Sequence, residues 1–209
     1  WFHAASLGEF EQGRPIMEEL KRTHPEYKIL LTFFSPSGYE VRKDYPLADV
    51  VCYLPFDKKR NVKRFLKIVQ PKMAIFIKYE FWYHYLSQIK KNNIRLYLVC
   101  GIFRNDQVFF KPYGNWYRKI LSCFTHLFVQ DQHSINLLKS IQITNVSYAG
   151  DTRFDRVAQI ADSSKEIEIA SKFSEGKFCF VCGSTWPQDE EFLSKYINNS
   201  PGNFGFIIA

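Results

Sequence analysis

The chain has 209 residues, of which 46% are hydrophobic and 23% are charged. This composition can bury a core, so it excludes a wholly disordered chain, and the length fits one large domain or two small ones. No run approaches the ~20 apolar residues that a membrane-spanning helix needs. The five cysteines are scattered and odd in number, which argues against a disulfide scaffold and favours reduced thiols.

Positive charge is concentrated in the first part of the chain. The net charge of +7 divides into +10 for residues 1–150, with 22 basic and 12 acidic groups, and −3 for residues 151–209, with 6 and 9. A basic surface of this kind is typical of a protein that faces an anionic partner. Nucleic acid, a phosphorylated small molecule, an acidic membrane surface and a solvated face without a partner all remain open on charge alone.

Short apolar runs alternate with amphipathic segments along the chain. In order, the predicted strands are Lys28–Phe34, Val50–Leu54, Met73–Ile77, Arg95–Gly101, His126–Gln130, Val146–Ala149, Phe178–Cys182 and Phe204–Ala209. The predicted helices are Glu11–Thr23, Ser37–Asp44, Lys58–Val69, Phe81–Lys91, Trp116–Cys123 and Gln132–Ser140. The strand runs are continuously apolar, as in strands buried on both faces. We therefore predict an α/β fold, a Rossmann-like parallel sheet with helices on both faces, whose sites gather at the carboxyl ends of the strands.

The alternation of predicted strands and helices is interrupted at residues 151–175, where no strand is predicted. This polar stretch predicts a helix plus a connection, so we place the domain boundary there, and residues 176–209 open a second domain. The apolar run at Phe204–Ala209 has the character of a buried strand that needs neighbours. We therefore expect the sequence to be part of a longer chain.

A turn of small residues at the start of the chain is the first candidate site. Ala4, Ala5, Ser6 and Gly8 precede a predicted helix, and small residues let a ligand approach the backbone N–H groups at a helix start. Glu9 at this turn is a candidate general base. The alternative is that Glu9 only interacts favourably with the helix dipole.

A second candidate is Glu80, in the segment KYEFW that directly follows the apolar run Met73–Ile77. That position is the carboxyl end of a strand, where sites gather in this class of fold. Two carboxylates at strand ends of one sheet, Glu9 and Glu80, favour a catalytic site. The alternative for Glu80 is a helix cap.

The helix predicted between Asp57 and Gln70 has one apolar and one cationic face. Its buried stripe comprises Val62, Phe65, Leu66 and Val69, and its basic residues are Lys58, Lys59, Arg60, Lys63, Arg64 and Lys67. The cationic face is either simply solvated or contacts anionic lipid or phosphate. Aromatic and basic residues also interleave at Phe103–Lys119, which suits nucleic-acid bases, a membrane interface or packing into the core.

A strand, a turn and a helix follow one another at Cys182–Glu191. The turn Gly183-Ser184-Thr185 resembles an anion site at a helix N-terminus. Cys179 and Cys182 form a CxxC pattern, but in a strand their side chains point to opposite faces. No second cysteine pair or histidine cluster accompanies them, so we expect no metal site.

Five segments of the chain, in this order and spacing, resemble one family. They are WFHAASLGEFEQGRP, LLTFFSPSGYE, KYEFW, GIFRNDQVFFKPYG and the pair formed by GDTRFD with GSTWPQDEE. On these residues the chain is identified as a member of the 3-deoxy-D-manno-octulosonic acid (Kdo) transferases of lipid A and lipopolysaccharide biosynthesis. The aromatic-rich segments KYEFWYHYL and IFRNDQVFFKPYG are similar to the Bacteroidetes-type branch.

The resemblance implies the B-type glycosyltransferase fold, in which two Rossmann-like domains face each other across a cleft. Residues 1–150 would receive the lipid acceptor, 151–175 would connect the domains, and 176–209 would begin the donor domain. The implied partners are the donor CMP-Kdo, a lipid A precursor (lipid IVA) and the anionic cytoplasmic face of the bacterial inner membrane, without nucleic acid or a cofactor. An N-terminal anchor would precede Trp1, and we expect this chain alone to be inactive.

The resemblance also implies roles for single residues. Its S-x-G-E motif corresponds here to Ser6-Leu7-Gly8-Glu9, which makes Glu9 the general base and places Ser6 and Gly8 against the substrate. The second important glutamate of the family corresponds to Glu80. This sequence departs from the family at that motif, where Lys78 replaces a glutamate and Phe81 replaces a leucine.

The remaining implied contacts to substrate are Arg104, Arg153, Gly183, Ser184 and Thr185, and the implied membrane or acceptor surface comprises Lys59, Lys63 and Lys67. Arg153 stands where the family has lysine, which keeps the charge and changes its geometry. Two rival hypotheses are another B-type glycosyltransferase with a different nucleotide sugar and a basic nucleic-acid-binding module. Glu9 and Glu80 argue against the latter because carboxylates repel phosphates.

Overall fold

The computed structural model describes residues 1–162 and 166–208. The chain divides into two compact units, Trp1–Gln159 and Ile160–Ala209. This division falls within residues 151–175, the segment expected to connect two domains.

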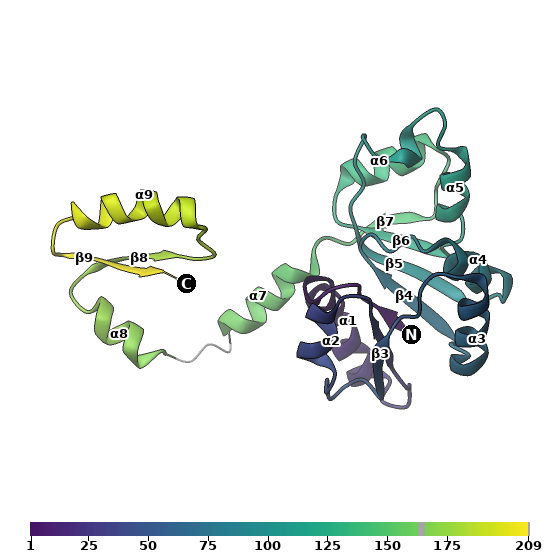
Figure 1. Cartoon of the computed structure of the whole chain (residues 1–209), viewed down its shortest axis with the longest axis horizontal. Helices are drawn as coiled ribbons and strands as arrows, with labels where there is room; N and C mark the ends of the chain where they lie inside the picture. The colour runs from purple at the N-terminus through teal and green to yellow at the C-terminus, as the bar shows by residue number, and fades with distance from the viewer. Residues whose placement is uncertain (163–165, 209) are drawn as a thin grey trace. The chain divides into compact units, whose positions relative to one another are not determined.

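The first unit is built on a parallel sheet of seven strands in the order β3-β2-β1-β4-β5-β6-β7 (Figure 1). The strands are β1 Phe2–His3, β2 Leu30–Phe33, β3 Val50–Tyr53, β4 Met73–Ile77, β5 Arg95–Gly101, β6 His126–Val129 and β7 Val146–Tyr148. All six pairings are parallel. The predicted parallel α/β fold is therefore confirmed.

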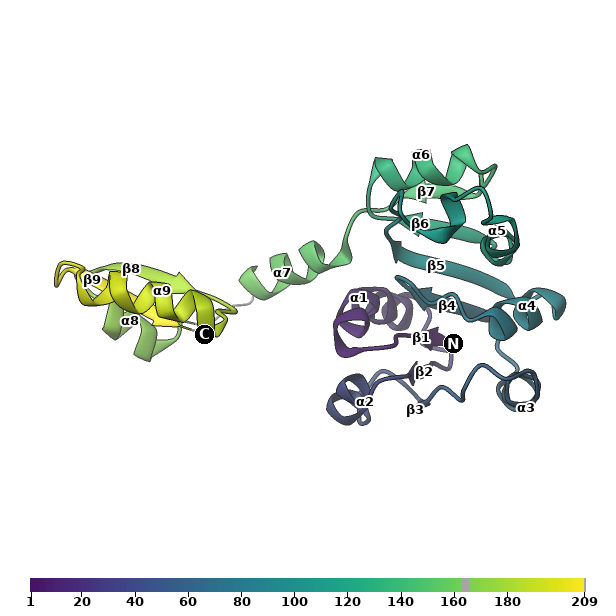
Figure 2. The same ribbon diagram turned by 45° about the horizontal axis from the view of Figure 1, so that its top comes forward.

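Helices cover both faces of this sheet (Figure 2). They are α1 Leu7–Thr23, α2 Pro36–Arg42, α3 Lys59–Val69, α4 Tyr83–Lys91, the 3-10 turn η1 Val108–Phe110, α5 Asn115–Leu121 and α6 Gln132–Ser140. The helix α7 Thr152–Asp162 follows β7 and spans the division between the two units. Alternate residues of β4 supply two hydrophobic clusters. Ala74 and Phe76 join the cluster of α3, α4, α5 and α6, whereas Ile75 and Ile77 join that of α1 and α2.

Two details at the start of the chain differ from the prediction. The strand β1 was missed, because two residues are too few to produce a periodic signal. The helix α1 begins at Leu7 rather than Glu11. Pro15 lies inside this helix of 17 residues, where its missing N–H removes one hydrogen bond of the helix.

The strands β1 and β4 are neighbours at the point where the order of the sheet reverses. Phe2 pairs with Leu31 on one side and with Ile75 on the other. The chain runs outward from β1 through β2 to β3, and then returns by α3 to β4 and continues the other way. In such sheets ligands bind outside the carboxyl ends of the strands at this reversal.

The second unit contains a parallel pair of strands, β8 Phe178–Cys182 and β9 Phe204–Ile208, with helices α8 Glu168–Ser174 and α9 Pro187–Asn198. Both predicted strands are thus present, although Ala209 lies outside the described residues. The helix and connection expected over residues 151–175 are α7 and α8, of which α8 had no clear sequence signal. Cys179 and Cys182 lie in β8 as predicted, and their thiols are free.

The close approach of α1 to β4 depends on Gly13. A Cβ atom at this position would lie 2.1 Å from Cδ1 and 3.2 Å from Cγ1 of Ile77, which is fully buried. The exposed Gly8, on the same helix, has nothing within 4 Å of such a Cβ atom. The contact at Gly13 therefore fixes how α1 lies on the sheet.

We predict that Gly13→Ala destabilises the first unit by about 1–3 kcal/mol, because the added methyl group overfills a packed contact. Gly8→Ala is the matched control and should leave the free energy of unfolding unchanged or slightly higher, because alanine favours a helix over glycine. Denaturant unfolding of the two variants measures the difference. Equal stabilities would show that α1 does not need this close contact.

Candidate active site

The turn between β1 and α1 lies at the carboxyl edge of the sheet. The backbone N–H of Ala4 donates to Thr32 O at 3.0 Å, which continues the pairing with β2 past the end of β1. Ala5 O accepts hydrogen bonds from the backbone N–H groups of Phe34 and Ser35. Ser6 then caps α1 in an extended conformation. The small residues thus form an ordered turn, and Gly8 leaves the start of α1 open to solvent.

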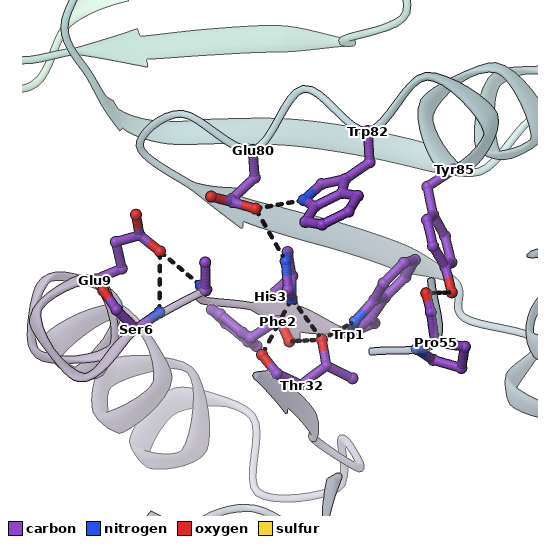
Figure 3. Close-up of polar contacts among 11 residues, drawn as sticks. Trp1, Phe2, His3, Ser6, Glu9, Thr32, Pro55, Glu80, Trp82 and Tyr85 are labelled. Carbon is purple, nitrogen blue, oxygen red and sulfur yellow. Dashed lines mark hydrogen bonds and ion pairs between the residues drawn. The ribbon is translucent and has the colours of Figure 1, made fainter. Parts of the chain in front are cut away.

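Glu9 lies in the first turn of α1 and folds back toward this turn (Figure 3). Its Oε2 accepts hydrogen bonds from the backbone N–H groups of Ala5 at 2.5 Å and Ser6 at 3.3 Å. No described residue donates a hydrogen bond to its other oxygen, Oε1. One oxygen of Glu9 therefore stabilises the start of the helix, which is the structural role that the sequence offered as the alternative. The other oxygen is available to accept a proton.

The pKa of Glu9 is raised to about 7. The main cause is burial, which disfavours the carboxylate form, and the second is the nearby negative charge of Glu80. The hydrogen bonds from Ala5 and Ser6 and the positive charge of Lys78 act in the opposite direction and lower the pKa. A carboxylate whose pKa lies near neutrality is suited to accept a proton.

Glu80 follows β4 and is buried, with 8% of its surface exposed. Its Oε2 accepts a hydrogen bond from Nε1 of Trp82 and lies 3.2 Å from Nε2 of His3 (Figure 3). Glu80 does not cap α4, because the backbone N–H groups of His84 and Tyr85 donate to Asp57 instead. The structure therefore brings Glu80 to the same edge of the sheet as Glu9, where the two carboxylates interact.

His3 belongs to this site and was missed in the sequence. It is fully buried and contacts Glu80 across 77 positions of the chain. One signal was present: a polar residue inside the apolar run at the start of the chain must find a partner when it is buried.

Lys78 lies between β4 and Glu80 in a left-handed backbone conformation, with φ of 70°. Its backbone N–H donates to Val99 O at 2.9 Å, which keeps this turn paired with β5. Its ammonium group lies 5.4 Å from the ring centre of Tyr79. This lysine, at the position where the family resemblance has a glutamate, adds a positive charge beside two carboxylates.

An aromatic cavity of about 620 Å³ opens beside Glu80. Its walls are Asp57, Tyr79, Glu80, Phe81, Trp82, Tyr83, Val108, Phe109, Trp116, Tyr117 and Ile120. The rings of Tyr83 and Trp116 lie 4.9 Å apart at its rim. The cavity therefore joins a carboxylate to a large apolar surface.

The aromatic residues of the segment 103–119 divide between the core and the surface. Phe103 and Phe109 are buried, whereas Tyr113 is 75% and Trp116 is 49% exposed. The guanidinium group of Arg118 donates to the backbone oxygens of Phe109 and Lys111, at 2.8 and 2.9 Å. Core packing and an exposed aromatic surface, which the sequence left as alternatives, are thus both present.

The two arginines of the predicted site are exposed. Arg104 follows β5 at the same edge of the sheet, and its backbone N–H donates to Oε1 of Gln107. Arg153, at the start of α7, binds Asp151 through Nε at 2.8 Å. Asp151 also accepts from Nε2 of Gln12 on α1, so part of the charge of Arg153 is already balanced within the chain.

Gly183, Ser184 and Thr185 lie in the second unit, between β8 and α9. Ser184 adopts a left-handed conformation with φ of 58°, and the hydroxyl of Thr185 donates to Oε1 of Glu190 at 3.0 Å. Asp189 also accepts from the backbone N–H of Trp186. Acidic side chains thus occupy the start of α9, and an anion site at this turn stays a prediction.

The cationic face of α3 is present as predicted. Val62, Phe65 and Leu66 are buried and Val69 is half-buried. The basic residues Lys58, Lys59, Arg60, Lys63, Arg64 and Lys67 are exposed, and none of them forms an ion pair with a residue that the structure describes. Because a crossover helix runs opposite to the strands, Lys58 and Lys59 lie nearest the carboxyl edge, and Lys67 lies about 12 Å farther along the helix than Lys59.

Residues 1–162 and 166–208 contain no group of three or more histidine, cysteine, aspartate or glutamate residues that could hold a metal ion. In the same residues, no helix is both long enough and apolar enough to cross a membrane.

Comparison with known protein families shows to which family the chain belongs. The family described as "3-Deoxy-D-manno-octulosonic-acid transferase (kdotransferase)" matches residues 1–156. The chain belongs to the Kdo transferase family. The match covers the whole seven-stranded sheet and both carboxylates, and it places the chain among glycosyltransferases rather than nucleic-acid-binding modules.

Two curated Kdo transferases illustrate the similarity. The enzyme of Aquifex aeolicus is 31% identical over 197 residues, which are 93% of this chain and 48% of that protein. The enzyme of Rickettsia felis is 25% identical over 211 residues, which are 98% of this chain and 44% of that protein. The chain thus spans about half the length of these relatives.

Solved structures show the same architecture at low sequence identity. UDP-GlcNAc 2-epimerase from Neisseria meningitidis has a TM-score of 0.67 at 13% identity, over 99% of this chain and 64% of that one. The epimerase from Rickettsia bellii has a TM-score of 0.59 at 11% identity, over 99% and 67%. These likenesses show the fold alone, a Rossmann-like half of the B-type glycosyltransferase fold.

The raised pKa of Glu9 predicts a particular dependence of stability on pH for this Kdo transferase chain. The folded state binds the proton of Glu9 more tightly than the unfolded state, whose pKa is about 4.5. The stability that Glu9 contributes is therefore complete below pH 4.5 and is lost as the pH rises through about 7.

Glu9→Gln removes this titration and keeps an oxygen for the N–H groups of Ala5 and Ser6. We expect the variant to exceed the original chain in free energy of unfolding at pH 8 and to lose that advantage toward pH 5. Urea unfolding across this range measures the difference. Carboxyl ¹³C NMR locates the titration directly, by the signal that Glu9→Gln removes. A midpoint near 4.5 for that signal would contradict the prediction.

Proposed function

We propose that the protein transfers Kdo from CMP-Kdo to a lipid A precursor, lipid IVA, in the biosynthesis of lipopolysaccharide, with Glu9 as the general base. The observation that carries this proposal is the position of Glu9: it lies at the reversal of strand order, its pKa is about 7, and one of its carboxylate oxygens accepts no hydrogen bond from any residue that the structure describes. Family membership supports glycosyl transfer, and the donor and the acceptor are part of the proposal.

In the proposed reaction, a hydroxyl of the acceptor attacks the anomeric carbon of Kdo. The new bond joins the acceptor oxygen to that carbon, and the bond from the carbon to the phosphate oxygen of CMP breaks. The proton of the hydroxyl passes to Oε1 of Glu9, and CMP leaves with the electron pair of the broken bond. Such proton transfer typically accelerates a reaction by about 10²–10⁴-fold.

The other residues of the site have supporting roles in this proposal. Glu80, held by Trp82, accepts a hydrogen bond from the acceptor and keeps it beside Glu9. Ser6 and Gly8 let the substrate approach the start of α1, and Arg104 balances negative charge of donor or acceptor. Arg153 and the turn Gly183-Ser184-Thr185 serve the donor.

The aromatic cavity beside Glu80 suits the apolar part of a lipid acceptor. Its volume of about 620 Å³ and its tyrosine and tryptophan rim match a ligand with a hydrocarbon portion and a polar head. We therefore propose that this edge of the first unit faces the anionic cytoplasmic surface of the inner membrane. Lys59, Lys63 and Lys67 contribute attraction to that surface.

The role of Glu9 is tested by turnover in the full-length enzyme. We expect Glu9→Gln to lower kcat by roughly 10²–10⁴-fold. Glu11→Gln on the same helix is the matched control, since Glu11 pairs with Arg14 and Arg42 and has no role in the proposed reaction. Transfer of Kdo from CMP-Kdo to lipid IVA by purified enzyme measures both. Near-normal transfer by Glu9→Gln would remove Glu9 from the mechanism.

The membrane surface is tested by charge reversal on α3. We expect the triple variant Lys59→Glu, Lys63→Glu and Lys67→Glu to bind anionic vesicles much more weakly at low salt, because each basic residue near such a surface contributes about 1 kcal/mol. Thermal unfolding should change little, since all three side chains are exposed. Co-sedimentation with vesicles of phosphatidylglycerol and phosphatidylcholine measures the binding.

The matched control reverses three exposed basic residues at the opposite edge of the sheet, Lys91, Arg95 and Lys139. It changes the net charge by the same amount, so a general effect of charge would weaken binding equally. Reversal of Lys59 alone should also weaken binding more than reversal of Lys67 alone. Equal losses from both triple variants would rule out a membrane surface at α3.

A further inference from the structure

A fully buried histidine, to which the proposed reaction assigns no role, touches Glu80. Nδ1 of His3 lies 3.1 Å from Thr32 O and 2.9 Å from Thr32 Oγ1, and Nε2 lies 3.2 Å from Oε2 of Glu80. The rings of Phe76 and Trp82 pack against the imidazole at centroid distances of 5.3 and 6.2 Å. Both nitrogens thus face polar atoms in an otherwise aromatic enclosure (Figure 3).

The partners of Thr32 determine which way its hydrogen bond to His3 runs. Nε1 of Trp1 can only donate, and it donates to Thr32 Oγ1 at 2.8 Å. The hydroxyl of Thr32 in turn donates to Phe2 O at 3.2 Å. Thr32 O, which lies 3.1 Å from Nδ1, is a carbonyl oxygen and can only accept a hydrogen bond. Nδ1 of His3 must therefore carry a proton and donate it to Thr32.

On the other side of the imidazole ring, Nε2 faces an oxygen of Glu80 that already accepts a hydrogen bond. Oε2 of Glu80 accepts from Nε1 of Trp82. A neutral imidazole that is protonated at Nδ1 would turn the lone pair of Nε2 toward a lone pair of this oxygen. Because unpaired polar contacts in a buried site are costly, a second proton is needed between Nε2 and Oε2.

We infer that His3 and Glu80 share a proton between Nε2 and Oε2 at neutral pH, and that His3 is thereby a positioning residue for Glu80. The hydrogen bonds from Trp82 and His3 converge on Oε2 and fix the orientation of the carboxyl group. The use of that orientation in Kdo transfer rests on the proposed function, whereas the shared proton does not.

The shared proton also sets the charge that Glu9 meets. With the proton, the pair of His3 and Glu80 is neutral overall, and without it the pair carries one negative charge. Besides Glu80, the charged group that acts on the pKa of Glu9 is Lys78, and the other neighbours of the imidazole, Phe76, Trp82 and Thr32, are uncharged. Loss of the proton therefore raises the pKa of Glu9 further.

The protonation of His3 can be measured in this chain without transferase activity. Long-range ¹H–¹⁵N NMR of the chain labelled at histidine reports which ring nitrogens carry protons, and proximity to the Phe76 ring assigns His3. We expect Nδ1 to be protonated at pH 7, together with either Nε2 or the carboxyl group of Glu80 in the ¹³C spectrum. A bare Nδ1, or a bare Nε2 facing an ionised Glu80, would overturn the inference.

A variant measures the consequence for Glu9. Gln at position 3 keeps an N–H for Glu80 but cannot carry the extra proton, so in His3→Gln the ¹³C titration of Glu9 should move upward, on the order of one pH unit. In the full-length enzyme, the acid limb of the pH–kcat profile should move by the same amount, whereas a merely structural role would lower kcat at all pH values.

The two measurements separate the inference from the proposed function. An unshifted titration of Glu9 in folded His3→Gln overturns the shared proton. A shifted titration without any change in the pH–kcat profile retains the shared proton and contradicts Glu9 as the base. Should His3→Gln fail to fold, the NMR measurement on the unaltered chain still decides the inference.

Discussion

The site depends on the adjacency of β1 and β4 at the reversal of strand order. Both strands end at the same edge, so the segments that follow them must share the space above the sheet. The chain places Glu9 after one strand and Glu80 after the other. Gly13 allows α1 to lie against Ile77 of β4, which holds the helix, and Glu9 with it, beside that edge. Parallel pairing thus determines which side chains meet, and close packing determines how near they come.

Two partly buried carboxylates that lie close together repel each other and lose hydration. In this chain, neighbouring hydrogen-bond donors and a lysine partly compensate for both effects. Glu9 is stabilised by the N–H groups of Ala5 and Ser6 and by the charge of Lys78. Glu80 has donors in Trp82 and His3. The compensation is incomplete for Glu9, because burial and the charge of Glu80 still raise its pKa. A site that neutralised this carboxylate completely would be more stable and would provide a poorer base.

The sequence revealed most of the fold because continuous apolar runs and the stripe on α3 are strong signals. It also placed Glu9 and Glu80 at strand ends. It could not reveal β1, whose two residues carry no period, or the contact of His3 with Glu80, which lie 77 positions apart. The pKa of Glu9 was equally out of reach, because it depends on burial and on a second carboxylate, and both arise only from tertiary structure.

The aromatic residues of the segment 103–119 are divided between the core and the surface, and this division affects how the segment can bind an apolar ligand. Phe103 and Phe109 anchor the segment in the core, and Arg118 ties down the backbone oxygens of Phe109 and Lys111. The exposed rings of Tyr113 and Trp116 are therefore presented from an ordered base rather than from a free loop. An apolar ligand that settles on them orders little additional chain, so more of its contact energy remains available as affinity.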